Sequence, residues 1–265
     1  MKSITIQTTK KIYFASDFHL GTDGEAESSA CREKKIVEWL ESIRDDSSHL
    51  FLVGDIFDYW FEYKEVIPKG FTRFLGKLAE LSDDGVEVHF FTGNHDMWVF
   101  DYFKKELKIQ IHRTFQKFLI NDKQFIIGHG DGLGPGDMKY KFIKKIFANR
   151  VNQWLFARIH PNTGLGLMKY FSKKSRLYTS NEVYESEWLV QFCEDYQKKF
   201  PVDYYVFGHR HLPMNYNLSD GNGTYFNLGD WINHRSYGVF DSNKFYLQFF
   251  KNDNGVIFDR KTTPL

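Results

Sequence analysis

The chain of 265 residues has only two cysteines and no long apolar run. Cys31 and Cys193 lie far apart in the sequence, which excludes a disulfide framework and a cysteine-rich zinc fold and favours the reducing cytosol. No stretch approaches the roughly 18 apolar residues of a membrane-spanning helix, and residues 1–11 lack the apolar core of a signal peptide. We therefore expect a cytoplasmic protein that is not integral to a membrane.

Proline is also scarce, at six residues, and there is no proline-rich linker, internal repeat or low-complexity tract. Hydrophobic residues make up 42% of the chain and charged residues 26%, a balance that excludes a disordered or fibrous protein. A chain of this length fits one layered α/β domain that carries an insertion. We expect a single domain over residues 1–265.

Acidic residues are absent from one long segment, residues 139–176, which contains ten lysines and arginines. The other residues hold 25 basic and 34 acidic side chains, so they carry a net charge of −9, although the whole chain carries +1. A basic block of this kind indicates a partner that bears phosphate. Nucleic acid, an anionic membrane surface and an anionic substrate all meet that description.

Short β-branched and aromatic runs alternate with amphipathic stretches in the first half, a pattern typical of βαβ units. It predicts strands at 11–16, 49–53 and 86–92, helices at 33–42, 71–81 and 100–107, and a hairpin of 115–120 with 124–128. The second half predicts a long helix at 182–200, a buried strand at 204–207, and consecutive strands of antiparallel character at 225–228, 236–240 and 245–250.

Five polar clusters follow apolar runs, and they begin at residues 17, 54, 93, 128 and 208. Because strand ends converge on one edge of an α/β sheet, these clusters are expected to meet in space. Their Asp, His and Asn side chains, without thiolate, suit a pair of divalent cations such as Mn²⁺, Fe²⁺, Zn²⁺ or Mg²⁺. A lone histidine is usually structural, but four in this setting favour a metal centre. Strand alternation would point Asp17 with His19, and His209 with His211, to the same face.

In order, these clusters read D-x-H, G-D-x-x-D, G-N-H-D, G-H-x-D and G-H-x-H, and they resemble the calcineurin-like metallophosphoesterase superfamily. The resemblance implies an α/β (α+β) four-layer sandwich of two mixed sheets flanked by helices. It also implies two divalent cations, with Mn²⁺ expected first and Fe²⁺, Zn²⁺ or Mg²⁺ as alternatives. Carried over position by position, it implies one cation held by Asp17, His19, Asp55 and His211, and a second held by Asp55, Asn94, His129 and His209.

Such a pair of cations binds phosphate oxygens, acidifies a bridging water and stabilises an in-line displacement. His95 is the candidate for protonating the leaving group or stabilising charge in the transition state. Asp96, the next residue, is expected to fix its tautomer, and a purely structural His95 is the alternative. The expected catalytic residues are therefore His95, Asn94 and Asp96.

The basic block forms part of an expected insertion at residues 138–180. Apolar residues at three- and four-residue spacing over 143–155 predict one basic amphipathic helix, and a second apolar group at 165–171, after Pro161, completes a helical hairpin cap. Such a helix could simply pack on its own core, but ten positive charges favour an amphiphilic phosphate at an anionic membrane. The aliphatic content argues against nucleic acid, and no obligate protein partner is implied.

From about Ile12 to Leu228 the arrangement resembles the UDP-2,3-diacylglucosamine hydrolase family of lipid A biosynthesis. That resemblance implies cleavage of the substrate's pyrophosphate to UMP and 2,3-diacylglucosamine 1-phosphate (lipid X), with the acyl chains held by the cap. It places the enzyme peripherally on the inner face of the bacterial inner membrane. The implied contacts to substrate or membrane are Asn94, His95, His209, Asp137, Ser175, Arg158, Lys173, Lys174 and Arg176.

The chain departs from the best-known branch of that family at His95, where the branch has arginine, and at Thr179 and Glu182, where Asn and Lys are expected. Another lipid pyrophosphate or a phosphodiester is therefore an alternative substrate. A soluble phosphodiesterase or nucleotidase of the same superfamily is a second alternative. A non-catalytic scaffold is a third, against which the presence of all seven expected metal ligands argues.

Overall fold

The computed structural model describes residues 2–7, 9–134, 138–179 and 187–251, and for 138–140 and 174–179 it describes the backbone only. It contains two six-stranded sheets, and the expected βαβ units of the first half of the chain build one of them. Four of its strands run parallel, and two antiparallel strands extend it. The strand order is β12 (Phe245–Phe249), β11 (Ser236–Phe240), β2 (Lys11–Ala15), β3 (Ser47–Val53), β4 (Glu87–Phe91) and β5 (Gln110–His112).

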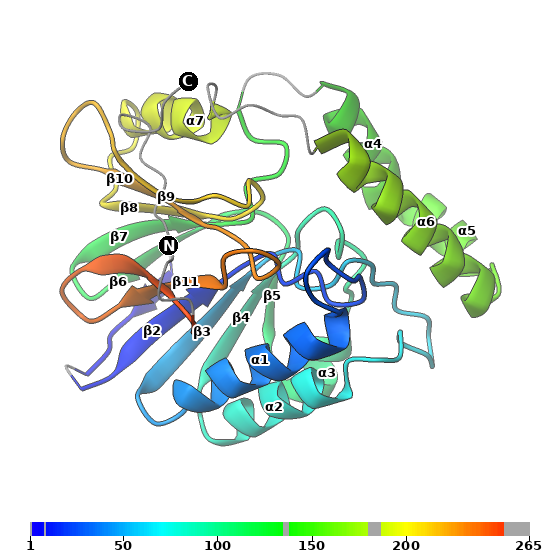
Figure 1. Ribbon diagram of the computed structural model, residues 1–265. Helices are drawn as coiled ribbons and strands as arrows, with labels where there is room; N and C mark the ends of the chain where they lie inside the picture. The colour runs from blue at the N-terminus through cyan, green and yellow to red at the C-terminus, as the bar shows by residue number, and fades with distance from the viewer. Residues whose placement is uncertain (1, 8, 135–137, 180–186, 252–265) are drawn as a thin grey trace.

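The second sheet is also mixed, and its edge strand comes from the start of the chain. Its order is β1 (Lys2–Ile4), β6 (Gln116–Ile120), β7 (Lys123–Ile127), β8 (Tyr204–Phe207), β10 (Thr224–Leu228) and β9 (Pro213–Asn217). The helices of the body are α1 (Ser29–Ser42), α2 (Thr72–Asp83) and α3 (Tyr102–Leu107) on the first sheet and α7 (Trp188–Gln197) on the second. Figure 1 shows these helices on the two outer faces.

Three apolar layers hold this sandwich together. The layer between the sheets is rich in phenylalanine, and Phe14 stacks on Phe51 with ring centroids 4.9 Å apart. The other two layers bury the inner faces of α1, α2 and α3 on one side and of α7 on the other. The expectation of two mixed sheets flanked by helices is confirmed.

The differences from the expected elements lie mainly at the sheet edges. Strands β1, β5 and β9 were not expected; two of them are only three residues long, too short to show a hydrophobic period. The antiparallel series expected at the end of the chain is wrong in part, because β10 pairs in parallel with β8 and lies in a different sheet from β11. Helix α7 begins at Trp188 rather than at 182, and residues 182–186 lie outside the described part.

The insertion forms three helices instead of the expected hairpin: α4 (Met138–Ala148), α5 (Arg150–Phe156) and α6 (Pro161–Thr179). The single helix expected over 143–155 is wrong because Asn149 interrupts it. The Asn149 side chain accepts hydrogen bonds from the backbone of Val151 and Asn152, and so caps a new helix. In Figure 1 the three helices lie together beside the sandwich, and we call residues 138–179 the cap.

The cap is attached to the body through aromatic contacts. Trp98 donates a hydrogen bond to the carbonyl of Phe147 at 2.8 Å, and the Phe156 ring lies 4.8 Å from Phe61 and 4.7 Å from Trp98. Leu165 and Met168 of α6 pack against the layer under α1 and α2. Among the described residues, none of the helices combines the length and the hydropathy that crossing a bilayer requires.

Candidate metal centre

The five polar clusters come together at one edge of the sandwich, because each follows the carboxyl end of a strand. They follow β2, β3 and β4, which are parallel neighbours in the first sheet, and β7 and β8, which are parallel neighbours in the second. The sequence argument from strand ends therefore correctly located the cluster. All seven expected metal ligands lie within two groups of neighbouring side chains described below.

Left-handed backbone, rather than strand alternation, aims these side chains. The φ angles are 55° at Asp17, 44° at His19, 51° at Asp55, 69° at His209 and 55° at His211. The reason expected for the Asp17/His19 and His209/His211 pairs is thus wrong, since all four residues lie beyond their strands in turns. Non-glycine residues adopt this conformation at a cost of about 1–3 kcal/mol each, and such strain gathers at functional sites.

Two glycines allow the clusters to approach each other. A Cβ on Gly93 would lie 2.2 Å from Asp55 Oδ1, and a Cβ on Gly208 would lie 2.0 Å from Ser16 Oγ and 2.5 Å from Asp17 Oδ2. All three distances are too short for a side-chain carbon, so only glycine fits at either position. The glycines that precede the polar residues are therefore part of the architecture of the site.

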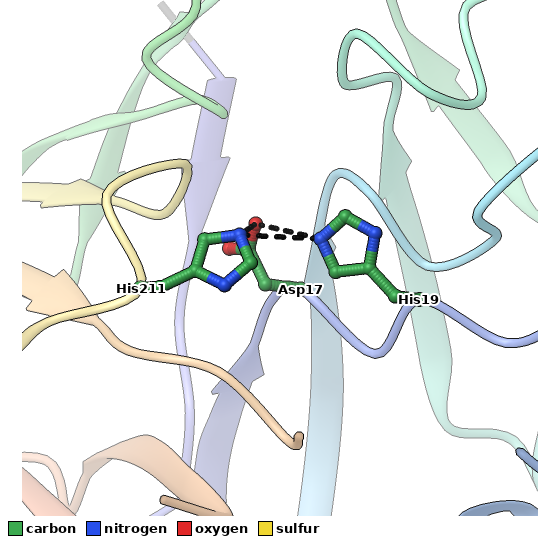
Figure 2. Close-up of side chains that lie close together, drawn as sticks. All are labelled: Asp17, His19 and His211. Atoms are coloured by element: carbon green, nitrogen blue, oxygen red, sulfur yellow. Dashed lines mark hydrogen bonds and ion pairs between the residues drawn. The ribbon is translucent and has the colours of Figure 1, made fainter. Parts of the chain in front are cut away.

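The first group consists of Asp17, His19 and His211 (Figure 2). Asp17 Oδ1 lies 3.6 Å from His19 Nε2 and 3.2 Å from His211 Nε2, and the two Nε2 atoms are 3.2 Å apart. Figure 2 shows both rings directed at the carboxylate from opposite sides. Asp17 is fully buried, and its Oδ1 faces these two imidazole nitrogens.

The second group consists of Asp55, His129 and His209, with Asn94 beside it. Nε2 of His129 lies 3.2 Å from Asp55 Oδ2 and 3.2 Å from Asn94 Oδ1. The same Asp55 oxygen is 3.9 Å from His19 Nε2 of the first group. Asp55 therefore lies between the two groups, within reach of both.

Burial and neighbouring charges shift the pKa values of the side chains in these groups. Burial opposes protonation of His129, but the Asp55 carboxylate outweighs burial and raises the pKa of that imidazole to about 10. Burial would raise the pKa of Asp17, yet His211 holds it well below its usual range. Burial, together with the neighbouring His129, lowers the pKa of His209 to about 4. Buried carboxylates surrounded by imidazoles provide the oxygen and nitrogen ligands that divalent cations bind.

Further hydrogen bonds orient the imidazoles. Nδ1 of His129 donates to the Val53 carbonyl at 2.9 Å, and Nδ1 of His211 lies 3.1 Å from Asp230 Oδ2. Both bonds leave Nε2 as the nitrogen that faces the site, as in metal-bound histidines. The sequence analysis missed Asp230, although the apolar run, glycine and aspartate at 228–230 repeat the pattern that located Asp55.

His95 is oriented by a different aspartate from the one expected. Its Nδ1 donates to the Asp58 carbonyl at 3.0 Å and lies 3.2 Å from Ser172 Oγ, and that hydroxyl donates to Asp58 Oδ2 at 2.6 Å. Asp96 instead accepts hydrogen bonds from the backbone N–H groups of Gly93 and Ile56. The expectation that Asp96 fixes the His95 tautomer is therefore wrong, and Asp96 holds the loop in place.

Ser172 belongs to α6, so this contact joins the cap to the metal centre, and no sequence signal marked it. Among the expected substrate contacts, the Arg158 guanidinium lies 4.6 Å from the Trp154 ring on the cap, and Lys173 is exposed. Asp137 lies outside the described residues. Lys174, Ser175 and Arg176 lie in α6, where the structure describes only the backbone.

The cap leaves most of its apolar side chains in solvent. Of the twelve large apolar residues that the described part exposes, ten lie on it: Phe142, Ile143, Ile146, Phe147, Val151, Trp154, Leu155, Leu167, Tyr170 and Phe171. A monomeric protein rarely exposes so many together unless they bind something. The alternative that these residues simply pack on the protein's own core is therefore wrong for most of them.

Comparisons with known proteins agree with this geometry. The family model described as calcineurin-like phosphoesterase matches residues 10–213. A UDP-2,3-diacylglucosamine hydrolase of Porphyromonas gingivalis is 41% identical over 255 residues, which cover 90% of this chain and 97% of that protein. Enzymes of the same name from Histophilus somni and Vibrio atlanticus are each 26% identical; the matches cover 84% and 90% of this chain and 92% and 96% of theirs.

Proposed function

The chain belongs to the calcineurin-like phosphoesterase family, and from that premise we propose that it hydrolyses the pyrophosphate of UDP-2,3-diacylglucosamine to UMP and 2,3-diacylglucosamine 1-phosphate. One observation carries the choice of substrate: the cap joins an exposed apolar and basic surface to the metal centre through Ser172. A lipid that bears a nucleotide diphosphate has both parts that this arrangement suits. The reaction is a step of lipid A biosynthesis.

We assign two divalent cations to the centre, with Mn²⁺ as the expected pair. Asp17, His19, Asp55 and His211 would hold one, and Asp55, Asn94, His129 and His209 the other. The buried Asp17 carboxylate between two imidazoles and the position of Asp55 between the two groups support this assignment. Bound there, two cations supply Lewis acidity to the phosphate and an activated water for in-line attack.

The chain's own side chains then position the reacting groups. Asp230 and the Val53 carbonyl hold two of the ligand imidazoles in their tautomers. His95 is fixed through Nδ1, and its Nε2 would hold the proton for the leaving group. Burial outweighs the Asp55 carboxylate and lowers the pKa of His95, whereas an anionic substrate would raise it and so favour the protonated form in the complex.

The cap supplies the remainder of substrate binding in this proposal. Its exposed apolar side chains take the acyl chains, while Arg158 and Lys173 contact phosphate or the membrane surface. We place Asp137, Ser175 and Arg176 at the sugar and phosphate end on the family resemblance alone. The enzyme would act peripherally at the cytoplasmic face of the inner membrane, with residues 138–180 as the cap of one domain.

The test is mass spectrometry of the products from UDP-2,3-diacylglucosamine, Mn²⁺ and mild detergent. UMP and the diacyl sugar phosphate are expected from the parent, and neither from an Asp55→Ala control. Intact lipid substrate together with rapid turnover of a water-soluble phosphodiester would retain the metal centre and reject the lipid substrate. Absence of bound metal and of both activities would indicate a non-catalytic scaffold.

A further inference from the structure

A second group of histidines lies at the opposite end of the strands from the metal centre. His49 stands on β3, and Glu87 and His89 stand on β4, where His49 is the register partner of Glu87. The metal centre follows the carboxyl ends of these strands, six residues further along β3 at Asp55. At about 3.3 Å per residue, the two sites are roughly 20 Å apart. This second group is therefore independent of the reaction.

The three side chains already face one another. One ligand atom from each of His49, Glu87 and His89 lies within 4.8 Å of the other two, and His49 Nε2 is 3.8 Å from Glu87 Oε2. Nε2 of His89 is buried and has no hydrogen-bond partner among the described residues. A buried, unpaired ring nitrogen costs about 1–3 kcal/mol, so its retention here needs an explanation.

Hydrogen bonds engage Nδ1 of both imidazoles. The Ser48 hydroxyl donates to the Lys11 carbonyl at 3.0 Å, so its oxygen accepts the proton of His49 Nδ1 at 3.0 Å. Nδ1 of His89 is likewise engaged, 3.1 Å from Nε2 of His112. Engaging Nδ1 in this way leaves Nε2 as the ligating atom, the arrangement that metal-bound histidines use.

We propose that His49, Glu87 and His89 form a third cation site that binds Zn²⁺ through two imidazole nitrogens and one carboxylate oxygen. Mixed nitrogen and oxygen ligands suit zinc, whereas Mg²⁺ and Ca²⁺ prefer oxygen alone. Zinc ligands at 2.0–2.1 Å lie about 3.3 Å from one another in a tetrahedron. Because the Glu87 side chain is 61% exposed, it is free to make the small rotation that closes the observed 3.8 Å.

The surrounding charges set the strength of this site. Burial lowers the pKa of His89 to about 3 and also lowers that of His49, so both rings are neutral at pH 7 and bind a cation without first losing a proton. Lys2 opposes binding: its ammonium donates to Gln110, whose side-chain nitrogen donates to Glu87. Bound zinc would link β3 to β4 and stabilise the folded chain.

Equilibrium dialysis of the full-length protein tests this proposal. Chelator-stripped protein is dialysed against buffered free Zn²⁺, and the metal bound per chain is measured by elemental analysis. The parent should bind one zinc more than His49→Gln, and Glu87→Gln should bind the extra zinc about tenfold or more weakly. Lys2→Gln should bind it several-fold more tightly because an opposing charge is gone. Equal zinc in the parent and His49→Gln would overturn the proposal.

Two controls keep this site separate from the metal centre. Asp55→Ala should lose metal at the centre but retain the zinc that His49→Gln loses, so the two assignments fail independently. Hydrolysis in Mn²⁺ should be unchanged in His49→Gln and Glu87→Gln. If His49→Gln does not fold, the exposed Glu87→Gln still decides the outcome. Anomalous diffraction at the zinc edge should show a peak between His49, Glu87 and His89, and peaks at the metal centre alone would also reject the site.

Discussion

The metal centre and the cap are built in opposite ways. At the centre, Asp17, Asp55 and His129 are almost completely buried, and the backbone of five ligand residues is left-handed. On the cap, ordinary helices hold ten large apolar side chains in solvent. Under the proposed function, the reacting groups are fixed before substrate arrives, whereas the binding surface is completed only by its ligand. Ser172, which bonds to Asp58, connects the two.

The largest effect is expected from a variant that should lower the catalytic rate of the centre without changing the metal it binds. His95→Ala should lower kcat about 10²- to 10³-fold, because it removes the proton donor or charge-stabilising group next to the phosphate. Bound metal, measured by elemental analysis, should stay at the parent level, since His95 is not an assigned ligand. Loss of metal in this variant would mean that His95 is itself a ligand.

The next effect is expected from variants that remove exposed apolar side chains of the cap and leave the residues of the metal centre unchanged. Phe142→Ser and Phe171→Ser remove side chains that are 65% and 54% exposed, so the folded state should be little affected. Each lost acyl contact of about 1.5–3 kcal/mol should lower kcat/KM for the lipid substrate about 10- to 100-fold. Turnover of a water-soluble phosphodiester should not change.

The matched control for these variants is Phe200→Ser. Phe200 lies outside the cap and is 54% exposed, like Phe171. Its replacement removes the same apolar area and should leave the kinetics of both substrates at the parent level. An equal loss of lipid activity in Phe200→Ser and Phe171→Ser would show that the cap is no more a lipid site than the rest of the surface.

A smaller effect is expected at the junction of the two regions. Ser172→Ala removes the hydroxyl that donates to Asp58 and lies beside His95 Nδ1, so His95 should lose part of its orientation. At about 0.5–1.5 kcal/mol per hydrogen bond, kcat should fall about 2- to 10-fold, while KM for a soluble diester is unchanged. Ser172→Thr retains a hydroxyl and should recover part of the rate. A change in KM alone would indicate a substrate contact instead.

The last expected effect is on stability and its pH dependence rather than on activity, and it arises far from both regions. Burial lowers the pKa of His89 to about 3 and that of His112 to about 4, against about 6.5 in the unfolded chain. The unfolded state therefore binds more protons as pH falls below 6.5, and stability is lost on the acid side. Between pH 6.5 and 5.5 each histidine should cost about 1 kcal/mol.

Urea unfolding in the presence of chelator measures this loss at each pH. His89→Phe, which replaces one of the two rings with a side chain that suits the neighbouring Phe51, should lose about half of the pH dependence. Other titrating groups are common to both proteins and cancel in the difference. If parent and variant lose the same free energy of unfolding as pH falls, His89 is not neutral in the folded chain.

Much of the fold could be predicted because its main elements have a clear hydrophobic period. Strands β2, β3 and β4 and helices α1 and α2 lie within a few residues of their expected bounds. The three-residue strands β1 and β5 could not be predicted, because pairing with a neighbour, rather than their own sequence, makes them strands. The break at Asn149 was missed because a single cap residue overrode a continuous apolar pattern.

The sequence by itself determined which residues gather at one site, because glycine, carboxylate and imidazole types follow strands whose ends must converge. Only the tertiary structure decided how they are aimed. Left-handed turns set the directions of Asp17 and His19, and partners distant in sequence, Asp230 and Ser172, orient His211 and His95. Such contacts join residues with no local pattern between them, so they exist only once the sheets and the cap have packed.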